Sequence, residues 1–212
     1  MKTKLGILLI VFGLVLMVMA GVMFFNNEQE QIQAADSVDS VMPQLVQAIV
    51  EKQEETQKPV HVTAPAEEPE TTVVTLPEPE EMSVVEIDGH EYIGFLGIPT
   101  IQTEVPIMAD WSYSKLKISP CRFTGDLYDD NLVIMSHNYT RHLGSLRDLR
   151  VGDPVTFTDV NGKTTAYEVV AMDILPATAV DEMVAGEYDL TLFTCTYGTE
   201  SRITARCDRV DN

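Results

Sequence analysis

Cysteine, tryptophan and basic side chains are all scarce in this chain of 212 residues. Its three cysteines are too few for a framework of disulfides. Only 14 lysines and arginines stand against 33 aspartates and glutamates, which gives a net charge of −19. Because nucleic acids are held largely by clustered basic side chains, this balance argues against a nucleic-acid-binding protein. The length allows one ordinary domain with accessory segments, but not two large domains.

The N-terminal segment Leu5–Phe25 contains no charged residue. As a helix it would be about 31 Å long, which matches the hydrocarbon thickness of a bilayer. Lys2 and Lys4 precede it and acidic residues follow, so the positive-inside rule predicts a cytoplasmic N-terminus with the remaining chain outside the cell. We therefore expect residues 1–25 to form a cytoplasmic tip and a single transmembrane anchor. The alternative is a cleaved signal peptide.

Residues 26–80 are acidic and rich in proline, with six of the eleven prolines in the chain. Proline and like-charge repulsion keep such a segment extended, so it predicts an extracellular stalk that holds a domain off the membrane. Within it, Met42, Leu45, Val46 and Ile49 follow helical spacing. This spacing indicates a short amphipathic helix, which we interpret as local structure of the stalk. A contact site on the domain is the alternative.

From residue 81 onward the sequence consists of short apolar runs separated by turn residues. The runs are 92–98, 105–107, 131–136, 155–157, 167–172, 190–194 and 203–206. Asn161-Gly162 lies between two of them and is a strong hairpin signal. Seven or eight short strands with few helices predict a closed barrel or a sandwich over residues 81–212.

Three chemically active side chains stand at the ends of predicted strands. Cys195 directly follows the run 190–194, His137 directly follows the run 131–136, and Arg202 directly precedes the run 203–206. A thiol, an imidazole and a guanidinium could serve as nucleophile, acid/base and cation. The residues alone leave open a second interpretation, with a structural cysteine and a surface histidine.

The stretch Thr191-Leu192-Phe193-Thr194-Cys195 resembles the TLxTC motif of sortases, the cysteine transpeptidases of Gram-positive bacteria. Other segments resemble the first sortase strand, the strand that ends in the catalytic histidine and the turn that follows it; these are 92–99, 131–138 and 149–155. Arg202 stands where the family has its catalytic arginine. The resemblance extends from about Tyr92 to Arg209.

This resemblance implies a mainly β fold, a closed or partly closed sortase-like barrel of about eight strands with short helices, preceded by one transmembrane helix. It implies that Cys195, His137 and Arg202 are catalytic and that Thr194 supports substrate or oxyanion binding. The implied reaction cleaves an LPxTG-like sorting motif in secreted proteins, forms a thioester on Cys195 and transfers the product to an amine of the cell wall. It requires neither a cofactor nor a metal.

The sequence also departs from the common sortase pattern. Ser136 stands where many members have glycine, and no second apolar span follows Asn212, which tells against the pilin-polymerising class. We expect a class B- or D-like enzyme. Two alternatives keep the same domain: a cysteine endopeptidase that uses water as acceptor, and a non-catalytic barrel that binds surface proteins.

Other reactive residues are weaker candidates for a catalytic, disulfide-forming or metal-binding role. His142 competes with His137 for the catalytic position but lies inside the following loop. Alternation along the last strand places Cys207 inside the barrel as a small hydrophobic side chain, and a disulfide to Cys121 is the alternative. Calcium binding is a further alternative to ordinary solvated charge, with candidates Glu104, Asp110 and Asp126.

Overall fold

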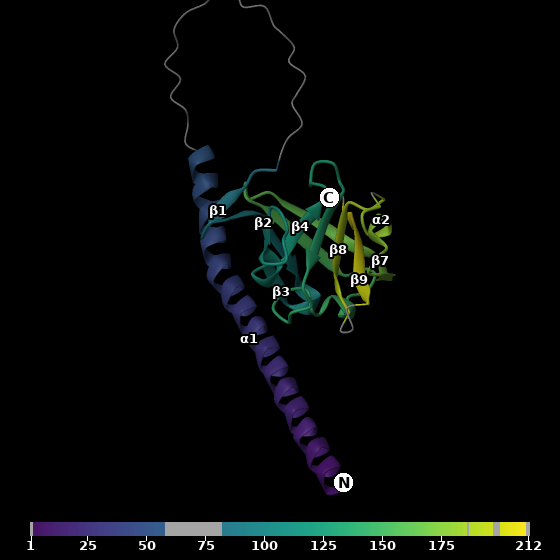
Figure 1. The fold of residues 1–212 in the computed structure, drawn as a ribbon. Coiled ribbons are helices and arrows are strands. Elements are labelled where there is room, and N and C mark those ends of the chain that lie inside the picture. The colour runs from purple at the N-terminus through teal and green to yellow at the C-terminus, as the bar shows by residue number, and fades with distance from the viewer. Residues whose placement is uncertain (1, 58–81, 186, 197–199, 211–212) are drawn as a thin grey trace, which may run out of the picture.

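The computed structural model describes residues 2–57, 82–185, 187–196 and 200–210. A long N-terminal helix lies against one side of a β-barrel (Figure 1). The proline-rich part of the predicted stalk, residues 58–80, lies outside the described residues.

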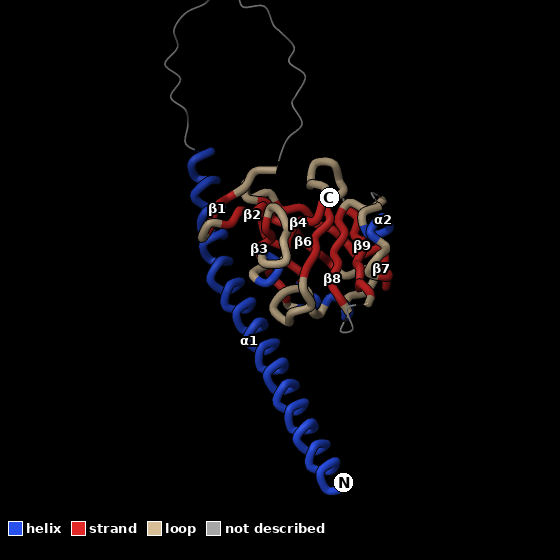
Figure 2. Tube along the Cα trace, in the orientation of Figure 1, coloured by secondary structure: helices blue, strands red, loops and turns tan. Residues whose placement is uncertain are grey.

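The described residues form nine strands whose pairing closes a barrel (Figure 2). The strands are β1 (Val85–Ile87), β2 (His90–Ile98), β3 (Thr103–Met108), β4 (Cys121–Thr124), β5 (Leu132–Ser136), β6 (Pro154–Asp159), β7 (Thr164–Pro176), β8 (Leu190–Cys195) and β9 (Ser201–Arg209). Their order is β1-β2-β3-β4-β5-β8-β9-β7-β6, and an additional pairing of β2 with β6 closes the ring. Eight strands therefore form the barrel, β1 extends it beside β2, and the predicted fold class is confirmed.

Strand pairing in the barrel depends on local features of the sequence. The predicted hairpin joins β6 to β7, and its Asn161-Gly162 turn is fixed by Asp159, whose Oδ1 accepts the backbone N–H groups of Asn161 and Lys163 at 2.9 Å each. Gly94 sits where β2 meets β6, and a Cβ there would lie 2.1 Å from the Thr158 carbonyl oxygen. Glycine at this position thus permits the close approach that closes the barrel.

The barrel interior is filled by the inward-facing residues of the predicted strands. Its fully buried members include Leu96, Ile107, Leu132, Phe157 and Leu192. These residues come from five different strands, so the apolar runs of the sequence supply one continuous core.

Short helices connect the strands: η1 (Pro99–Ile101), η2 (Lys115–Lys117), η3 (Leu146–Asp148) and α2 (Val180–Met183). The four-residue helix α2 is held by Arg206 of β9, which is 3% exposed. The Arg206 guanidinium donates to the carbonyl oxygens of Met183 at 3.0 Å and Glu182 at 2.5 Å. A buried charge with these partners fixes α2 against the outer face of the barrel.

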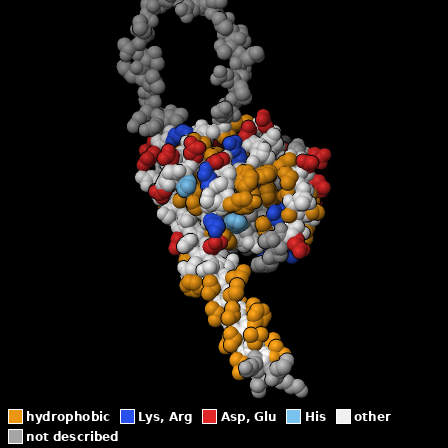
Figure 3. Space-filling view, in the orientation of Figure 1, with side chains coloured by type: hydrophobic (Ala, Val, Ile, Leu, Met, Phe, Trp, Pro, Cys, Tyr) orange, Lys and Arg blue, Asp and Glu red, His pale blue; other side chains and the backbone are white. Residues whose placement is uncertain are grey.

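Helix α1 runs without interruption from Lys2 to Gln57. Its first part, Leu5–Phe25, is apolar and exposed, and it is long enough to cross a membrane (Figure 3). The helix continues through residues 26–57, the first part of the predicted stalk. Pro43 lies inside the helix on its solvent side, where the loss of one backbone donor does not disturb packing.

The second half of α1 packs against the barrel. Its buried residues recur at intervals of three or four, as one face of a helix requires; they are Ala34, Val38, Val41, Leu45 and Ile49. Val38 joins the barrel core, and Leu45 packs in a second cluster with residues of β1, β2 and β3. The short amphipathic helix expected around residues 42–49 is therefore part of a longer one, and it contacts the domain.

Candidate active site

The ends of three adjacent strands bring the predicted catalytic residues together. Strands β5 and β8 are parallel with Ser136 opposite Thr194, so His137 and Cys195, the next residue along each segment, emerge at the same end of the barrel. Strand β9 runs antiparallel to β8, and Arg202 is the direct partner of Cys195. Because paired strands lie about 5 Å apart, this register puts all three residues at one edge.

His137, Cys195 and Arg202 line one cavity of about 340 Å³. Its other walls are mostly apolar and include Trp111, Phe123, Met135, Val180, Met183 and Phe193. The cavity is partly open, and Cys195 is partly exposed, so a substrate carbonyl could reach the thiol. A pocket with apolar walls and a few convergent polar groups is typical of ligand-binding sites.

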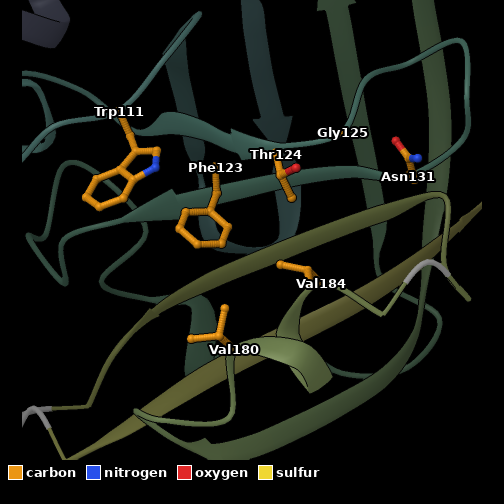
Figure 4. Close-up of a pocket in the computed structure, with 7 residues that line it drawn as sticks. All are labelled: Trp111, Phe123, Thr124, Gly125, Asn131, Val180 and Val184. Carbon is orange, nitrogen blue, oxygen red and sulfur yellow. The ribbon is translucent and has the colours of Figure 1, made fainter.

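A second cavity of about 460 Å³ adjoins the first and shares Trp111, Phe123 and Val180 with it. Trp111 and Phe123 lie on one side and Val180 and Val184 on the other (Figure 4). The Trp111 and Phe123 rings have centroids 5.6 Å apart, and Phe123 also meets Phe193 edge-to-face at 5.5 Å. The two cavities together form an apolar groove that leads to Cys195.

Thr194 contributes to the site by holding two strand ends together. Alternate residues of a strand face opposite sides, so Thr194 faces away from Phe193 and Cys195. Its hydroxyl is buried and donates to the Ser136 carbonyl oxygen at 3.1 Å. The Ser136 hydroxyl in turn donates to the His137 carbonyl oxygen at 2.8 Å. If Thr194 supports substrate or oxyanion binding, as predicted, it would do so indirectly, through the backbone that precedes His137.

His137 is partly buried and packs against Tyr139, with ring centroids 5.0 Å apart and 38° between the planes. Burial lowers the pKa of His137 below its ordinary value, and the positive charge of Lys117 acts in the same direction. The carboxylate of Glu30, on helix α1, acts in the opposite direction. No sequence pattern singled out Glu30, Lys117 or Tyr139.

His142 has the surroundings of a core side chain. It is fully buried, and its Nε2 lies 3.3 Å from the Ile118 carbonyl oxygen. Burial lowers the pKa of His142 to about 4, so the ring is neutral at neutral pH. Such a histidine is suited to packing, whereas His137 is the one that lines the cavity.

The three cysteines are free thiols, and they differ in exposure. Cys121 and Cys207 are buried, and burial raises the pKa of each to about 12. The structure therefore has no disulfide between these two residues, and Cys207 packs in the barrel core as expected. Cys195 is the partly exposed member of the three.

Two of the three acidic side chains considered for calcium, Asp126 and Asp110, have other partners. Asp126 Oδ1 accepts the backbone N–H groups of Tyr128 and Asp129, at 2.7 and 2.9 Å, and Asp110 pairs with Lys115. In the described part of the chain, no three or more His, Cys, Asp or Glu residues are grouped as a metal site would require.

Several known proteins are similar to this chain. The family model for the sortase domain matches residues 96–210, which is more than half of the chain. No curated protein sequence matches the chain. Sortase C1 from Streptococcus suis is 26% identical, with a TM-score of 0.52 over 58% of this chain and 75% of that one.

Two further solved structures are similar to this chain. Sortase C1 from Streptococcus agalactiae is 26% identical, with a TM-score of 0.51 over 60% of this chain and 72% of that one. Sortase A from Corynebacterium diphtheriae is 26% identical, with a TM-score of 0.50, and the match spans 58% of this chain and 62% of that one. Together with the barrel topology and the match to the family model, these likenesses establish that the chain belongs to the sortase family.

Proposed function

We propose that this protein is a membrane-anchored sortase that cleaves an LPxTG-like sorting motif in secreted proteins and transfers the product to an amine acceptor on the cell wall. The observation that supports this best is the single cavity lined by Cys195, His137 and Arg202 in a chain of the sortase family. The catalytic roles follow from the chemistry of these three groups.

The reaction has two covalent stages. The Cys195 thiolate attacks the carbonyl carbon of the scissile peptide bond, and a C–S bond forms. The resulting oxyanion is stabilised by the Arg202 guanidinium together with backbone N–H groups. The C–N bond breaks as the His137 imidazolium donates its proton to the departing amine, which leaves a thioester on Cys195.

The second stage regenerates the enzyme. An acceptor amine attacks the thioester carbonyl while neutral His137 removes a proton from it. A new amide C–N bond forms, the C–S bond breaks, and the Cys195 thiolate and the His137 imidazolium are restored. A peptidoglycan amine or an amine of another surface protein could serve as this acceptor.

The active form requires a thiolate and an imidazolium at the same time. Burial lowers the pKa of His137, which narrows the pH range in which the imidazolium persists. When a thiol pKa lies above that of its histidine partner, only a small fraction of molecules carries both charges at neutral pH. We therefore expect slow turnover.

The apolar groove suits a short extended peptide. Apolar side chains of a sorting motif would occupy the space between Phe123 and Val184, beside Trp111, while the scissile carbonyl lies over Cys195. Helix α2 forms one wall of this groove, and its anchoring by Arg206 would keep that wall rigid.

We place the protein in the cell membrane as a single-pass protein. Residues 1–25 would form the cytoplasmic tip and the anchor, residues 26–80 would lie outside the cell, and residues 81–212 would form the extracellular catalytic domain. The support is the apolar, exposed first part of α1 together with the lysines that precede it. The class B- or D-like assignment stays a prediction.

The test is mass spectrometry of the purified chain mixed with peptides that contain candidate sorting motifs. We expect a thioester on Cys195 and its absence in Cys195→Ala. Added amine should convert the acyl-enzyme into an amide product. Release of the acyl group by water alone, unaffected by the amine, would instead support an endopeptidase, and a lack of any adduct would support a binding protein.

A further inference from the structure

Helix α1 brings an acidic side chain to the edge of the active site. Glu30 lies five residues beyond Phe25, the last residue of the uncharged segment, which corresponds to about 8 Å along the helix axis. Its Oε2 accepts the Tyr139 hydroxyl at 2.9 Å, and its Oε1 accepts the Lys117 ammonium at 2.6 Å. Both bonds cross from α1 to the barrel, and they involve residues 109 and 87 positions away in sequence.

Tyr139 connects this carboxylate to the imidazole. Its side chain is 7% exposed, and its ring lies between His137, at 5.0 Å, and His142, at 5.4 Å between centroids. With the hydroxyl bonded to Glu30 and the ring packed against two histidines, the tyrosine has little rotational freedom. The Tyr139 ring beside His137 is therefore held by a bond made by α1.

The position of Glu30 is itself fixed by packing. The next turns of α1 bury Ala34, Val38 and Val41 against the barrel, so the helix holds Glu30 in place relative to η2 and the loop after β5. Lys117 and Tyr139 in turn lower the pKa of the Glu30 carboxyl by hydrogen bonding, the lysine bond being the stronger cause. Glu30 is thus ionised at neutral pH.

Several charged and titratable groups surround the His137 ring. They are Glu30 on α1, Lys117 on η2, and Tyr139 and His142 in the loop after β5, together with Cys195 on β8 and Arg202 on β9, which line the same cavity. Glu30 favours the imidazolium form of His137, whereas Lys117 and burial oppose it. Removal of the Glu30 charge would leave both opposing influences in place.

We propose that Glu30 is a positioning residue for His137, acting through Tyr139 and Lys117, so that the helix leading from the predicted membrane span completes the active site. This proposal rests on the proposed catalytic role of His137. In this view α1 is part of the catalytic apparatus as well as a tether.

The test compares Glu30→Gln with Glu28→Gln in the full chain in detergent micelles. Glu28 is exposed and lies two residues earlier on the same helix, so the control removes the same charge from a different face. The first readout is the rate of Cys195 acylation as a function of pH. The second is the titration of His137 by NMR with carbon-13-labelled histidine, assigned with the aid of His137→Gln.

We expect Glu30→Gln to move the acid limb of the pH–rate profile to lower pH and to reduce the plateau rate by about two- to fivefold, the range for a partly exposed charge pair. If the active form pairs a thiolate with an imidazolium, the shift of the acid limb and the loss of plateau rate are linked. Each pH unit by which the acid limb moves down lowers the fraction of molecules in the active form, and hence the plateau rate, tenfold. A purely structural defect would lower the rate at every pH without moving the limb. Glu28→Gln should match the wild type.

A double-mutant cycle tests the route through Tyr139. Tyr139→Phe keeps the ring beside His137 and removes the hydroxyl that binds Glu30. If Glu30 acts through this hydroxyl, the effect of Glu30→Gln will be smaller in the Tyr139→Phe background than in the wild type. Fully additive effects would show that the route does not pass through Tyr139 and would overturn the proposal.

The two readouts separate this proposal from the proposed function. If no acyl-enzyme forms in the wild type, the function fails, and the NMR titration still decides whether Glu30 is coupled to His137. A titration midpoint that is the same in Glu30→Gln and wild type overturns the proposal even if the wild type is fully active.

Discussion

Truncation of Leu45 tests whether helix α1 is a packed part of the folded domain. Leu45 is fully buried and lies among Tyr92, Met108 and Leu116 in the cluster between α1 and the barrel. Leu→Ala substitutions in protein cores cost about 2–5 kcal/mol. We expect about 2–3 kcal/mol for Leu45→Ala, because a helix on the outside of a barrel can settle partly into the space that the side chain leaves.

The neighbouring residue Val46 provides a matched control. It is 40% exposed and lies about 100° around the same helix from Leu45. Val46→Ala removes apolar atoms that face solvent and improves helix propensity, so we expect a change within about 0.5 kcal/mol. The two variants thus differ in burial while sharing the same element.

The assay is thermal unfolding of the full chain in micelles together with hydrogen exchange of residues 34–49. For a protein of this size, a loss of 2–3 kcal/mol lowers the Tm by about 4–12 °C. Leu45→Ala should also speed amide hydrogen exchange in this part of α1. The hydrogen bond between Glu30 and Tyr139 should then be weakened, because α1 is held less firmly on the barrel. Equal losses in the two variants, or unprotected amides at residues 34–49 in the wild type, would refute the packing of α1 on the barrel.

Three further predictions concern individual side chains. Arg202→Ala should slow Cys195 acylation by about 10²-fold or more, the usual cost of losing an oxyanion donor. Mass spectrometry of samples quenched at successive times measures this rate, and an unchanged rate would exclude Arg202 from the mechanism. Iodoacetamide at pH 8 should label Cys195 alone in the native protein and all three thiols after denaturation. The reason is that burial shields Cys121 and Cys207 and raises the pKa of each to about 12. Labelling of a second thiol in the native protein would contradict their burial. Burial lowers the pKa of His142 to about 4. The free energy of unfolding should therefore fall by roughly 3 kcal/mol between about pH 6.5 and pH 4, because the unfolded chain binds a proton at His142 that the folded chain does not. His142→Gln should remove this contribution in urea titrations and leave the one from His137, whose pKa burial also lowers; an unchanged dependence would contradict the assignment.

Most of the barrel could be predicted from the sequence because its strands have buried, apolar residues between clear turns. All seven predicted runs correspond to strands, and Asn161-Gly162 marks the β6–β7 hairpin. The two strands that were missed are short. β1 has three residues, and β4 is the four-residue segment Cys121–Thr124, in which only Cys121 is buried and exposure increases toward Thr124.

The extent of α1 was harder to predict. Its contact face uses Ala34 and Val38 in addition to the positions recognised around Leu45, and these two lie among acidic and polar residues. Pro43 also argues against a continuous helix, although on the solvent side it is tolerated. Burial against the barrel, which a local pattern does not contain, decides the structure of this segment.

The candidate site divides in the same way. The common position of Cys195, His137 and Arg202 could be predicted because each stands near a strand end in the segments that resemble sortases, and strand register brings the three together. Glu30 could not, because its contacts with Lys117 and Tyr139 join residues far apart in the chain. Long-range contacts of this kind follow only from the docking of α1.

The mass of the chain after incubation with a sorting-motif peptide tests the proposed transpeptidation most directly. We expect an acyl adduct that maps to Cys195, disappears in Cys195→Ala and is converted to an amide by an added amine. An adduct on another residue, or retention of peptide cleavage in Cys195→Ala, would contradict this proposal.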